Sequence, residues 1–205
     1  MSRVRLAQVV RELPRRAHDL SRKEVESSQR WRMLEAITEV TAKAGYAEAS
    51  VADVIALAGV SRKTFYEQFR DKEECFLTAY DVLSDQLVRA LVGVGADVRA
   101  GTARRRAQMA AFLGALAKDP AAARVFMVDV LGAGPRALKR RERVNASFAD
   151  AVLGDAVADP LRRAAIVGGV NNVVAGALIE SRTADLRALA APLSAFVEDA
   201  LGRGK

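Results

Sequence analysis

The sequence predicts an all-α protein in which a three-helix head is joined by a linking helix to a C-terminal helical bundle. Apolar residues recur at spacings of three and four along most of the 205 residues, and no strand-like alternation of useful length occurs. Alanine, leucine, valine and arginine dominate the composition, and only 5 prolines are present. Both features favour helices over sheets.

Residues 1–20 form a basic arm that is interrupted by Pro14. Residues 1–32 contain nine Arg or Lys against four Asp or Glu. An arm of this kind either contacts a polyanion, such as the phosphates or a minor groove of DNA, or is a solubilising tail. The composition leaves both interpretations open.

The first helix of the head is expected to begin at Arg22, because Ser21 and Glu24 have the spacing of a capping box. It ends at Gly45. Its inward positions are Trp31, Leu34, Ile37, Thr38 and Thr41. A lone tryptophan at helical spacing is typical of a core residue.

Residues 50–72, SVADVIALAGVSRKTFYEQFRDK, read as two short helices that meet at Gly59. Ser50 is a good N-cap, and Asp53 completes a pair resembling a capping box. One apolar face follows at helical spacing: Val51, Val54, Ile55 and Ala58. Gly59 is suited to the left-handed conformation that ends a helix, and Ser61 caps the next one.

The second of these helices has a narrow apolar face and a broad polar one. Phe65 and Phe69 lie four residues apart and are expected to point inward. At about 100° per residue, the polar side chains between and before them point away. Two helices joined by a short turn, the second polar outside, match a DNA-binding helix-turn-helix. An ordinary helical hairpin with a solvated face is the alternative.

The linking helix is predicted from Asp71, its N-cap, to about Val92, with Glu73 and Glu74 in its first turn. Its apolar positions repeat at threes and fours: Phe76, Leu77, Tyr80, Leu83, Leu87 and Leu91. Cys75 is interpreted as a packing residue.

After a break around 93–101, five helices are expected between about 104 and 202. Their predicted ranges are 104–118, 121–131, 135–153, 160–181 and 183–201. Prolines mark three of the starts, as Pro does at a first helical position. Pro192 is expected to kink the last helix or to shift its boundary. The predicted divisions are therefore a basic arm at 1–20, a helix-turn-helix domain at 21–70 and an effector-binding and dimerisation domain at 71–205.

The helix at 160–181 is mostly small and apolar but carries adjacent asparagines near its middle. A buried amide without a hydrogen bond costs about 1–3 kcal/mol, so one of the two is expected to face a partner helix, water or a ligand. A ligand cavity is predicted, with an ordinary packed core as the alternative. Its candidate residues are Phe112, Leu116, Phe126, Met127, Phe148, Val152, Asn171 and Asn172. The last two helices present small and apolar faces suited to a four-helix dimer interface.

Charge and residue usage restrict the partners. A formal charge of +7 suits a polyanion. Residues 99–143 add eleven Arg or Lys against three Asp or Glu, either as a solvated face or as an attraction for anionic ligands. One cysteine fits a reducing compartment. Without an apolar run long enough to span a bilayer, or a signal peptide, a cytoplasmic location is expected.

Catalysis is not expected. The only histidine, His18, lies in the basic arm, and the sequence has no His/Cys cluster for a metal, no glycine-rich phosphate loop and no nucleophile elbow. No cofactor is predicted.

The run from Trp31 to Tyr80 resembles the DNA-binding domain of TetR-family transcriptional regulators. The similarity is carried by GYAEASVADVIALAGVSRKTFYEQFRDKEECFLTAYD, with its V-x-D-V-I-x-x-A-G-V-S run and T-F-Y-x-x-F helix. It covers about a quarter of the chain, and the remaining helices match the family only in number and length. The resemblance implies a homodimer that binds a palindromic operator, usually as a repressor, and that a small molecule releases.

The resemblance also implies roles for individual residues. Arg62, Lys63 and Thr64 match positions that reach base edges, whereas Tyr66, Gln68 and Lys72 match positions that hold phosphates. Many relatives have a small residue in place of Lys63, so this lysine contacts either a guanine or a phosphate. The full DNA-binding set is Ser50, Ser61, Arg62, Lys63, Thr64, Tyr66, Glu67, Gln68 and Lys72. Two other functions remain: a constitutive architectural DNA-binding protein, and a helical ligand carrier or enzyme.

Overall fold

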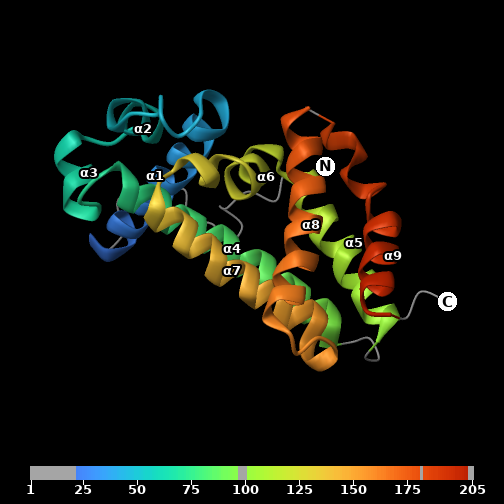
Figure 1. The fold of residues 1–205 in the computed structure, drawn as a ribbon. Helices are drawn as coiled ribbons and strands as arrows, with labels where there is room; N and C mark the ends of the chain where they lie inside the picture. The colour runs from blue at the N-terminus through green and yellow to red at the C-terminus, as the bar shows by residue number, and fades with distance from the viewer. Residues whose placement is uncertain (1–21, 97–100, 181, 203–205) are drawn as a thin grey trace.

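The computed structural model describes residues 22–96, 101–180 and 182–202 (Figure 1). Within these ranges the chain forms nine α-helices and no strand, which confirms the all-α prediction. The helices are α1 (Arg22–Ala44), α2 (Val51–Ala58), α3 (Arg62–Gln68), α4 (Lys72–Ala96), α5 (Thr102–Lys118), α6 (Pro120–Met127), α7 (Pro135–Leu153), α8 (Pro160–Ile179) and α9 (Ala190–Ala200). The predicted basic arm, its His18 and the Ser21–Glu24 capping box lie outside the residues whose side chains are described.

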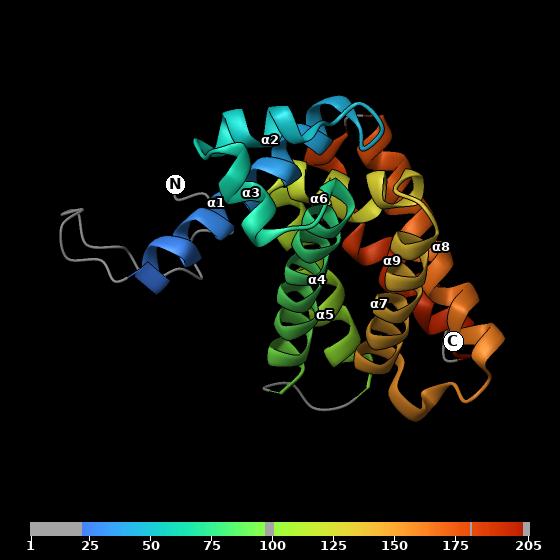
Figure 2. The same ribbon diagram turned by 90° about the vertical axis from the view of Figure 1, so that its left-hand side faces the viewer.

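The head is built by α1, α2 and α3, which lie together at one end of the molecule (Figure 2). Helix α1 packs along both α2 and α4. The inward residues predicted for α1 are buried, except for Trp31, which is half-buried against the core. Phe65 and Phe69 are almost completely buried, as their four-residue spacing predicted. Burying both rings fixes which face of α3 turns outward.

The linking helix α4 begins as predicted but ends later. The amide of Glu74 donates to Oδ1 of Asp71 at 2.7 Å, so Asp71 caps the helix. The prediction of an end at about Val92 was wrong, because α4 continues through Gly93 to Ala96. Glycine weakens a helix by only about 1 kcal/mol, and packing of α4 against α5 and α7 outweighs that preference.

Two further boundaries differ from the prediction by more than two residues. Helix α6 ends at Met127 rather than at 131, and a 3₁₀ helix, Asp129–Gly132, follows it. The last α-helix starts at Ala190 rather than at 183, after a 3₁₀ segment, Thr183–Arg187. Pro192 explains the second shift: the first-turn amides of a helix have no intrahelical acceptor, so a residue without N–H fits there.

The helices α5 to α9 form a bundle at the other end of the molecule, with α8 and α9 on the side away from the head (Figure 1). Helix α5 packs against α4 and α9, and α7 lies between α4 and α8. Helix α6 contacts α1 as well as α8. It therefore lies between the head and the outer helices of the bundle.

Candidate DNA-binding interface and ligand cavity

The start of α2 is fixed by the predicted capping box. The amide of Asp53 donates to Oγ of Ser50 at 3.2 Å, and the amide of Ser50 donates to Oδ2 of Asp53 at 3.2 Å. The Ser50 hydroxyl also donates to this carboxylate, which lowers the pKa of Asp53. At the other end, Gly59 has φ +61° and its amide donates to the carbonyl of Ile55, as the predicted left-handed ending requires.

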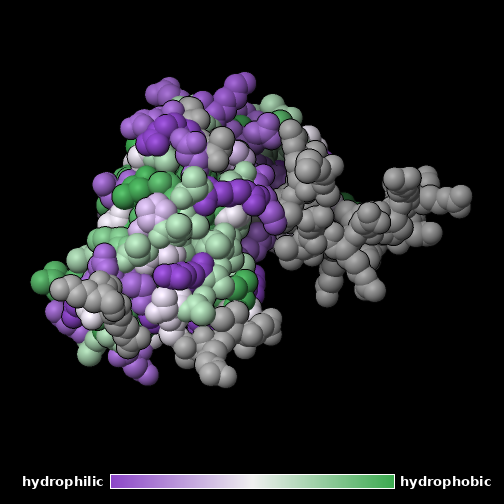
Figure 3. Space-filling model, turned by 90° about the vertical axis from the view of Figure 1, so that its right-hand side faces the viewer, coloured by the Kyte–Doolittle hydropathy of each residue, from purple (hydrophilic) through white to green (hydrophobic). Residues whose placement is uncertain are grey.

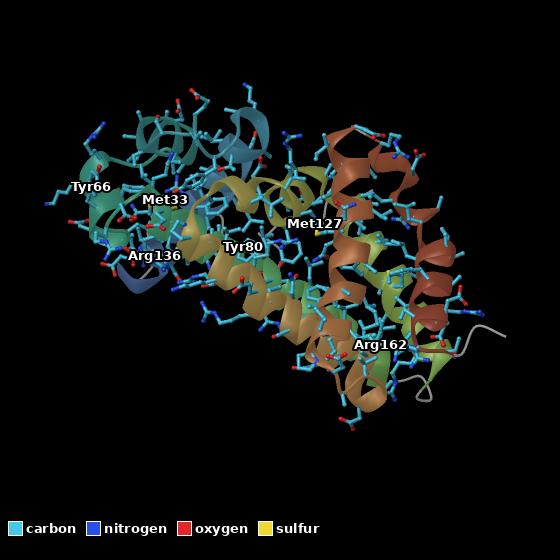
Figure 4. All side chains as sticks on the ribbon, in the orientation of Figure 1. Met33, Tyr66, Tyr80, Met127, Arg136 and Arg162 are labelled. Atoms are coloured by element: carbon cyan, nitrogen blue, oxygen red, sulfur yellow. The ribbon has the colours of Figure 1, made fainter. Side chains whose placement is uncertain are left out.

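Helix α3 presents its polar face to solvent. The amide of Thr64 donates to Oγ of Ser61 at 3.0 Å, so Ser61 is the N-cap. Arg62 is exposed at the first helical position, and Tyr66 is about half exposed and points away from the body at the outer edge of the head (Figure 4). Lys63 lies 3.9 Å from Glu67 in an exposed pair one turn apart. The structure thus brings these predicted DNA-binding residues together on one accessible surface.

Two arginines of α1, which the sequence analysis did not single out, hold the ends of the helix-turn-helix. Nη1 of Arg32 donates to the carbonyl of Ala58 at 2.8 Å, at the C-terminus of α2. Nη1 of Arg30 donates to the carbonyl of Gln68 at 3.0 Å, at the C-terminus of α3, and its guanidinium lies 4.4 Å from the ring centre of Phe69. Positive charge at a helix C-terminus is favourable. Arg32 therefore fixes α2, and Arg30 fixes α3, relative to α1.

Lys72 is engaged within the chain. Its ammonium donates to the carbonyls of Tyr46 at 2.8 Å and Ala49 at 2.7 Å, and more weakly to that of Ala47 at 3.4 Å. It also lies 4.3 Å from the ring centre of Tyr46. These contacts fasten the connection between α1 and α2 to the start of α4.

Several cations of the basic region 99–143 are also in ion pairs. Arg136 lies 2.9 Å from Glu73 and Arg140 pairs with Asp81, which ties α7 to α4 (Figure 4). Lys139 is exposed on the same helix. Part of this positive charge is therefore structural.

The sequence of the head identifies the family. Residues 33–79, from the middle of α1 into α4, match the profile of the bacterial regulatory proteins of the tetR family. By this match, the head of the chain is that of a TetR-family transcription regulator. No curated protein sequence matches this chain.

Solved structures share the regulator's fold over most of its length. The fatty acid degradation regulator FadR from Bacillus halodurans has a TM-score of 0.75 at 20% identity, over 85% of this chain and 95% of that one. FadR from Bacillus subtilis in complex with stearoyl-CoA has a TM-score of 0.72 at 18% identity, over 85% and 98%. A TetR family regulator from Marinobacter aquaeolei VT8 has a TM-score of 0.65 at 20% identity, over 84% and 96%.

The eight residues predicted to line a ligand cavity are divided by the structure. Four of them, Phe112, Phe148, Val152 and Asn171, line one cavity of about 40 Å³ in the bundle. Its other lining residues are Leu91, Gln108, Met109, Leu153, Ile166, Val167, Val170 and Val197. This cavity is referred to below as the bundle cavity.

The other four predicted residues lie elsewhere. Leu116 and Phe126 line a second cavity of about 260 Å³ between α4, α5 and α6. Met127 is buried and lines neither cavity. Asn172 is exposed, because one step along α8 turns it about 100° from Asn171.

Two amide side chains line the bundle cavity. Nδ2 of the half-buried Asn171 donates to Oδ1 of Asn145 on α7 at 2.9 Å, so of the three predicted surroundings (a partner helix, water or a ligand) it has a partner helix. Gln108, which sequence reasoning missed, is 2% exposed and bonds to backbone on both α4 and α7. The sequence feature that could have revealed Gln108 is a polar residue at an inward-facing position of α5.

The outer faces of α8 and α9 are largely apolar. Leu161 is 77% exposed, Ile179 59% and Phe196 42%. Figure 3 shows this side of the molecule, where pale green residues extend across much of the surface between scattered purple ones. Helices α8 and α9 approach closely here, since a Cβ at Gly169 would lie 3.1 Å from the ring of Phe196.

A membrane-spanning helix and a metal-binding cluster are both absent from the described ranges. None of the helices there is long and apolar enough to cross a bilayer. The same part of the chain holds no group of three or more His, Cys, Asp or Glu arranged for a metal. Burial raises the pKa of Cys75 to about 12, so its thiol stays protonated and packs in the core.

Proposed function

We propose that this regulator is a cytoplasmic repressor that binds a palindromic DNA operator as a homodimer and is released by a small-molecule effector. The observation that carries the proposal is the orientation of α3. Phe65 and, at its C-cap, Phe69 are buried in the head, whereas Arg62, Lys63 and Tyr66 are exposed to solvent. Long cationic and phenolic side chains on an exposed helix are suited to base edges and phosphates in a major groove.

Within this surface the proposed roles differ by position. Arg62, Lys63 and Thr64 occupy the first turn of α3 and are proposed to reach base edges, with Glu67 one turn further as an acceptor for a cytosine amino group. Tyr66 and Gln68 are proposed to hold phosphates, together with Ser50 and Ser61 at the two helix starts. Lys72 is proposed to act mainly by ordering the connection before α2, because its ammonium is already bound there.

The second copy is proposed to cover the apolar faces of α8 and α9. Leu161, Ile179 and Phe196 are exposed on these two helices, which lie on the side of the molecule away from the head. Two helices from each protomer would form a four-helix interface about a twofold axis. Such an interface would leave both α3 helices free to enter successive major grooves about 34–36 Å apart.

The effector is proposed to enter the bundle cavity and to act on the head through α6. At about 40 Å³ this cavity is smaller than the roughly 300–1,000 Å³ of a typical ligand site, so binding would require its walls to move. Phe148 lines it and lies 6.1 Å from Phe126 of α6, which is stacked on Tyr80 of α4 at 5.4 Å. Because α6 packs on α1, a displaced Phe148 would shift the head. FadR from Bacillus subtilis, which shares the fold, is in complex with stearoyl-CoA, which supports a small-molecule effector for this chain as well.

Selection of bound sequences from random DNA at fixed salt tests the proposal. An inverted repeat with half-sites about one helical turn apart is expected from a twofold dimer. Release of the selected DNA by a compound that binds the bundle would support the repressor mechanism. Specific binding that no ligand alters would indicate a constitutive DNA-binding protein, and turnover without DNA affinity would contradict both.

A further inference from the structure

The wall of the bundle cavity combines apolar side chains with one unusual amide. Of the residues that line it, only Gln108 and Asn171 are polar, and none carries a charge. Asn171 is already engaged by Asn145. Gln108 is 2% exposed, so whatever pairs with its amide must come from the protein interior or from a molecule inside the cavity.

The orientation of the Gln108 amide is fixed by its partners. Nε2 donates to the carbonyl oxygen of Leu91 at 3.1 Å and to that of Ala151 at 3.0 Å. Carbonyl oxygens only accept, so exchanging the two ends of the amide would set Oε1 against two other acceptors. Oε1 is therefore the end left for the cavity. Among the described residues it is buried without a hydrogen-bond partner.

A buried acceptor without a hydrogen-bond partner is unfavourable, so a molecule that brings a donor to it gains binding free energy. A carboxylate, phosphate or thioester presents only further acceptors to Oε1. A charged group would also enter a wall without a compensating charge, which is strongly disfavoured. The chemistry of the wall therefore selects for a neutral donor on an apolar body.

We propose that the bundle cavity binds an uncharged, largely apolar molecule whose hydroxyl group donates to Oε1 of Gln108. This inference rests on the proposed function only in naming that molecule as the effector; the binding preference itself is independent of DNA.

Hexanol and its isomer methyl pentyl ether are the matched probes. They have the same atoms and similar apolar surface, but only the alcohol has a donor. Binding of each to the full-length protein is measured by ligand-observed NMR titration. We expect hexanol to bind roughly tenfold more tightly than the ether, the ratio expected when a buried acceptor is paired in one complex and left unpaired in the other. Equal affinities, tighter binding of the ether, or no binding of either probe would overturn the proposal.

Two variants test whether the preference for hexanol comes from Gln108. Gln108→Met removes the acceptor and is expected to reduce the ratio of the affinities for hexanol and the ether to about one. Gln86→Met is the control: Gln86 lines the second cavity, and its Nε2 is also buried without a partner, but the substitution is expected to leave the ratio unchanged. If Gln108→Met does not fold, the measurement on the unmodified chain still decides the outcome. A tenfold preference that Gln108→Met retains would contradict the assignment to this residue.

The DNA readout separates the two proposals. Release of DNA by hexanol but not by the ether would support both. A hexanol preference that Gln108→Met abolishes, without any effect on DNA binding, would keep the site chemistry and contradict the effector role. DNA release by a carboxylate or thioester ligand alone, with no preference between the matched probes, would keep the effector role and overturn the hydroxyl assignment.

Discussion

The guanidinium of Arg105 and the carboxylate of Glu198 form a two-bond ion pair that joins α5 to α9 in the interior. Nε donates to Oε1 at 2.6 Å and Nη2 donates to Oε2 at 2.9 Å, with both side chains about 7% exposed. Thr102 also donates to Oε2, at 2.8 Å. Arg105 lies one turn before Gln108 on α5, and Glu198 lies two residues after Phe196. The pair therefore connects the wall of the bundle cavity with the proposed dimer surface.

Breaking this pair on one side is expected to be strongly destabilising. Arg105→Met leaves the carboxylate of Glu198 buried without its counter-charge, which typically costs about 3–5 kcal/mol. The double variant Arg105→Met/Glu198→Leu removes both charges and is expected to recover most of that loss. Urea denaturation at one fixed protein concentration measures all three proteins. A double variant no more stable than the single one would show that the charge pairing is not the cause.

Arg30→Gln is expected to weaken binding to operator and to random DNA by the same factor. Arg30 holds the C-terminus of α3 and is not expected to read a base, and the loss of one charge-assisted bond corresponds to about 1.5–3 kcal/mol at most. Fluorescence anisotropy with both DNAs gives the two affinities. A loss confined to the operator would contradict a positioning role.

Arg62→Ala is expected to relax the preference at particular base pairs by about 1–3 kcal/mol, and Lys63→Ala to do so if this lysine reaches a base. Tyr66→Phe is the matched control from the same face of α3. Its phenolic oxygen is proposed to contact a phosphate, so affinity should fall alike for all sequences. Repeating the selection with each variant shows which positions lose information. Unchanged preferences for Arg62→Ala would refute base reading by this residue.

Lys72→Met separates two roles of one side chain. Loss of its bonds to the carbonyls of Tyr46 and Ala49 is expected to lower the melting temperature. The salt dependence of DNA binding should change little, since the ammonium is occupied within the head. Thermal unfolding and affinity at several salt concentrations test both points. An unchanged melting temperature with a salt slope smaller by about one would instead indicate a phosphate contact.

Because Asp129 is buried, removing its charge is expected to stabilise the fold by an amount that depends on pH. Burial raises the pKa of this carboxyl, and Arg124, 3.8 Å away, offsets only part of the effect. A raised pKa means that the folded chain holds the proton more tightly, so stability falls as pH rises from the ordinary pKa of about 3.9 through the folded value.

Asp129→Asn is therefore expected to raise the free energy of unfolding at neutral pH, with a gain that shrinks as the pH approaches about 4. Chemical denaturation at both pH values measures the difference. A gain of equal size in acid and at neutral pH would show that it does not come from the charge.

Most starts of the helices, though not that of α9, were predictable because local chemistry sets them. Ser50, Ser61, Asp71, Asp119 and Asp159 each accept an amide of the helix that follows, and Pro135 opens α7 at the predicted residue. The ends were less predictable. Helix α4 passes through glycines that interrupt its pattern, because its packing partners are distant in the sequence.

The same distinction applies to the sites. The exposed face of α3 followed from the spacing of Phe65 and Phe69, since a helix fixes which residues share a face. The contacts of Arg30 with Gln68 and of Arg32 with Ala58 span 38 and 26 residues. Nothing local encodes them. Gln108 was missed for this reason too, because its partners lie on α4 and α7.

Titration of the full-length chain onto its selected operator tests the central claim most directly. The matched control is the same DNA with one half-site scrambled. Two protomers per operator are expected, with a loss of at least about a hundredfold in affinity on the scrambled DNA, because the second head then lacks its groove contacts. One protomer per operator, or equal affinity for both DNAs, would contradict a dimeric regulator that reads a palindrome with its two α3 helices.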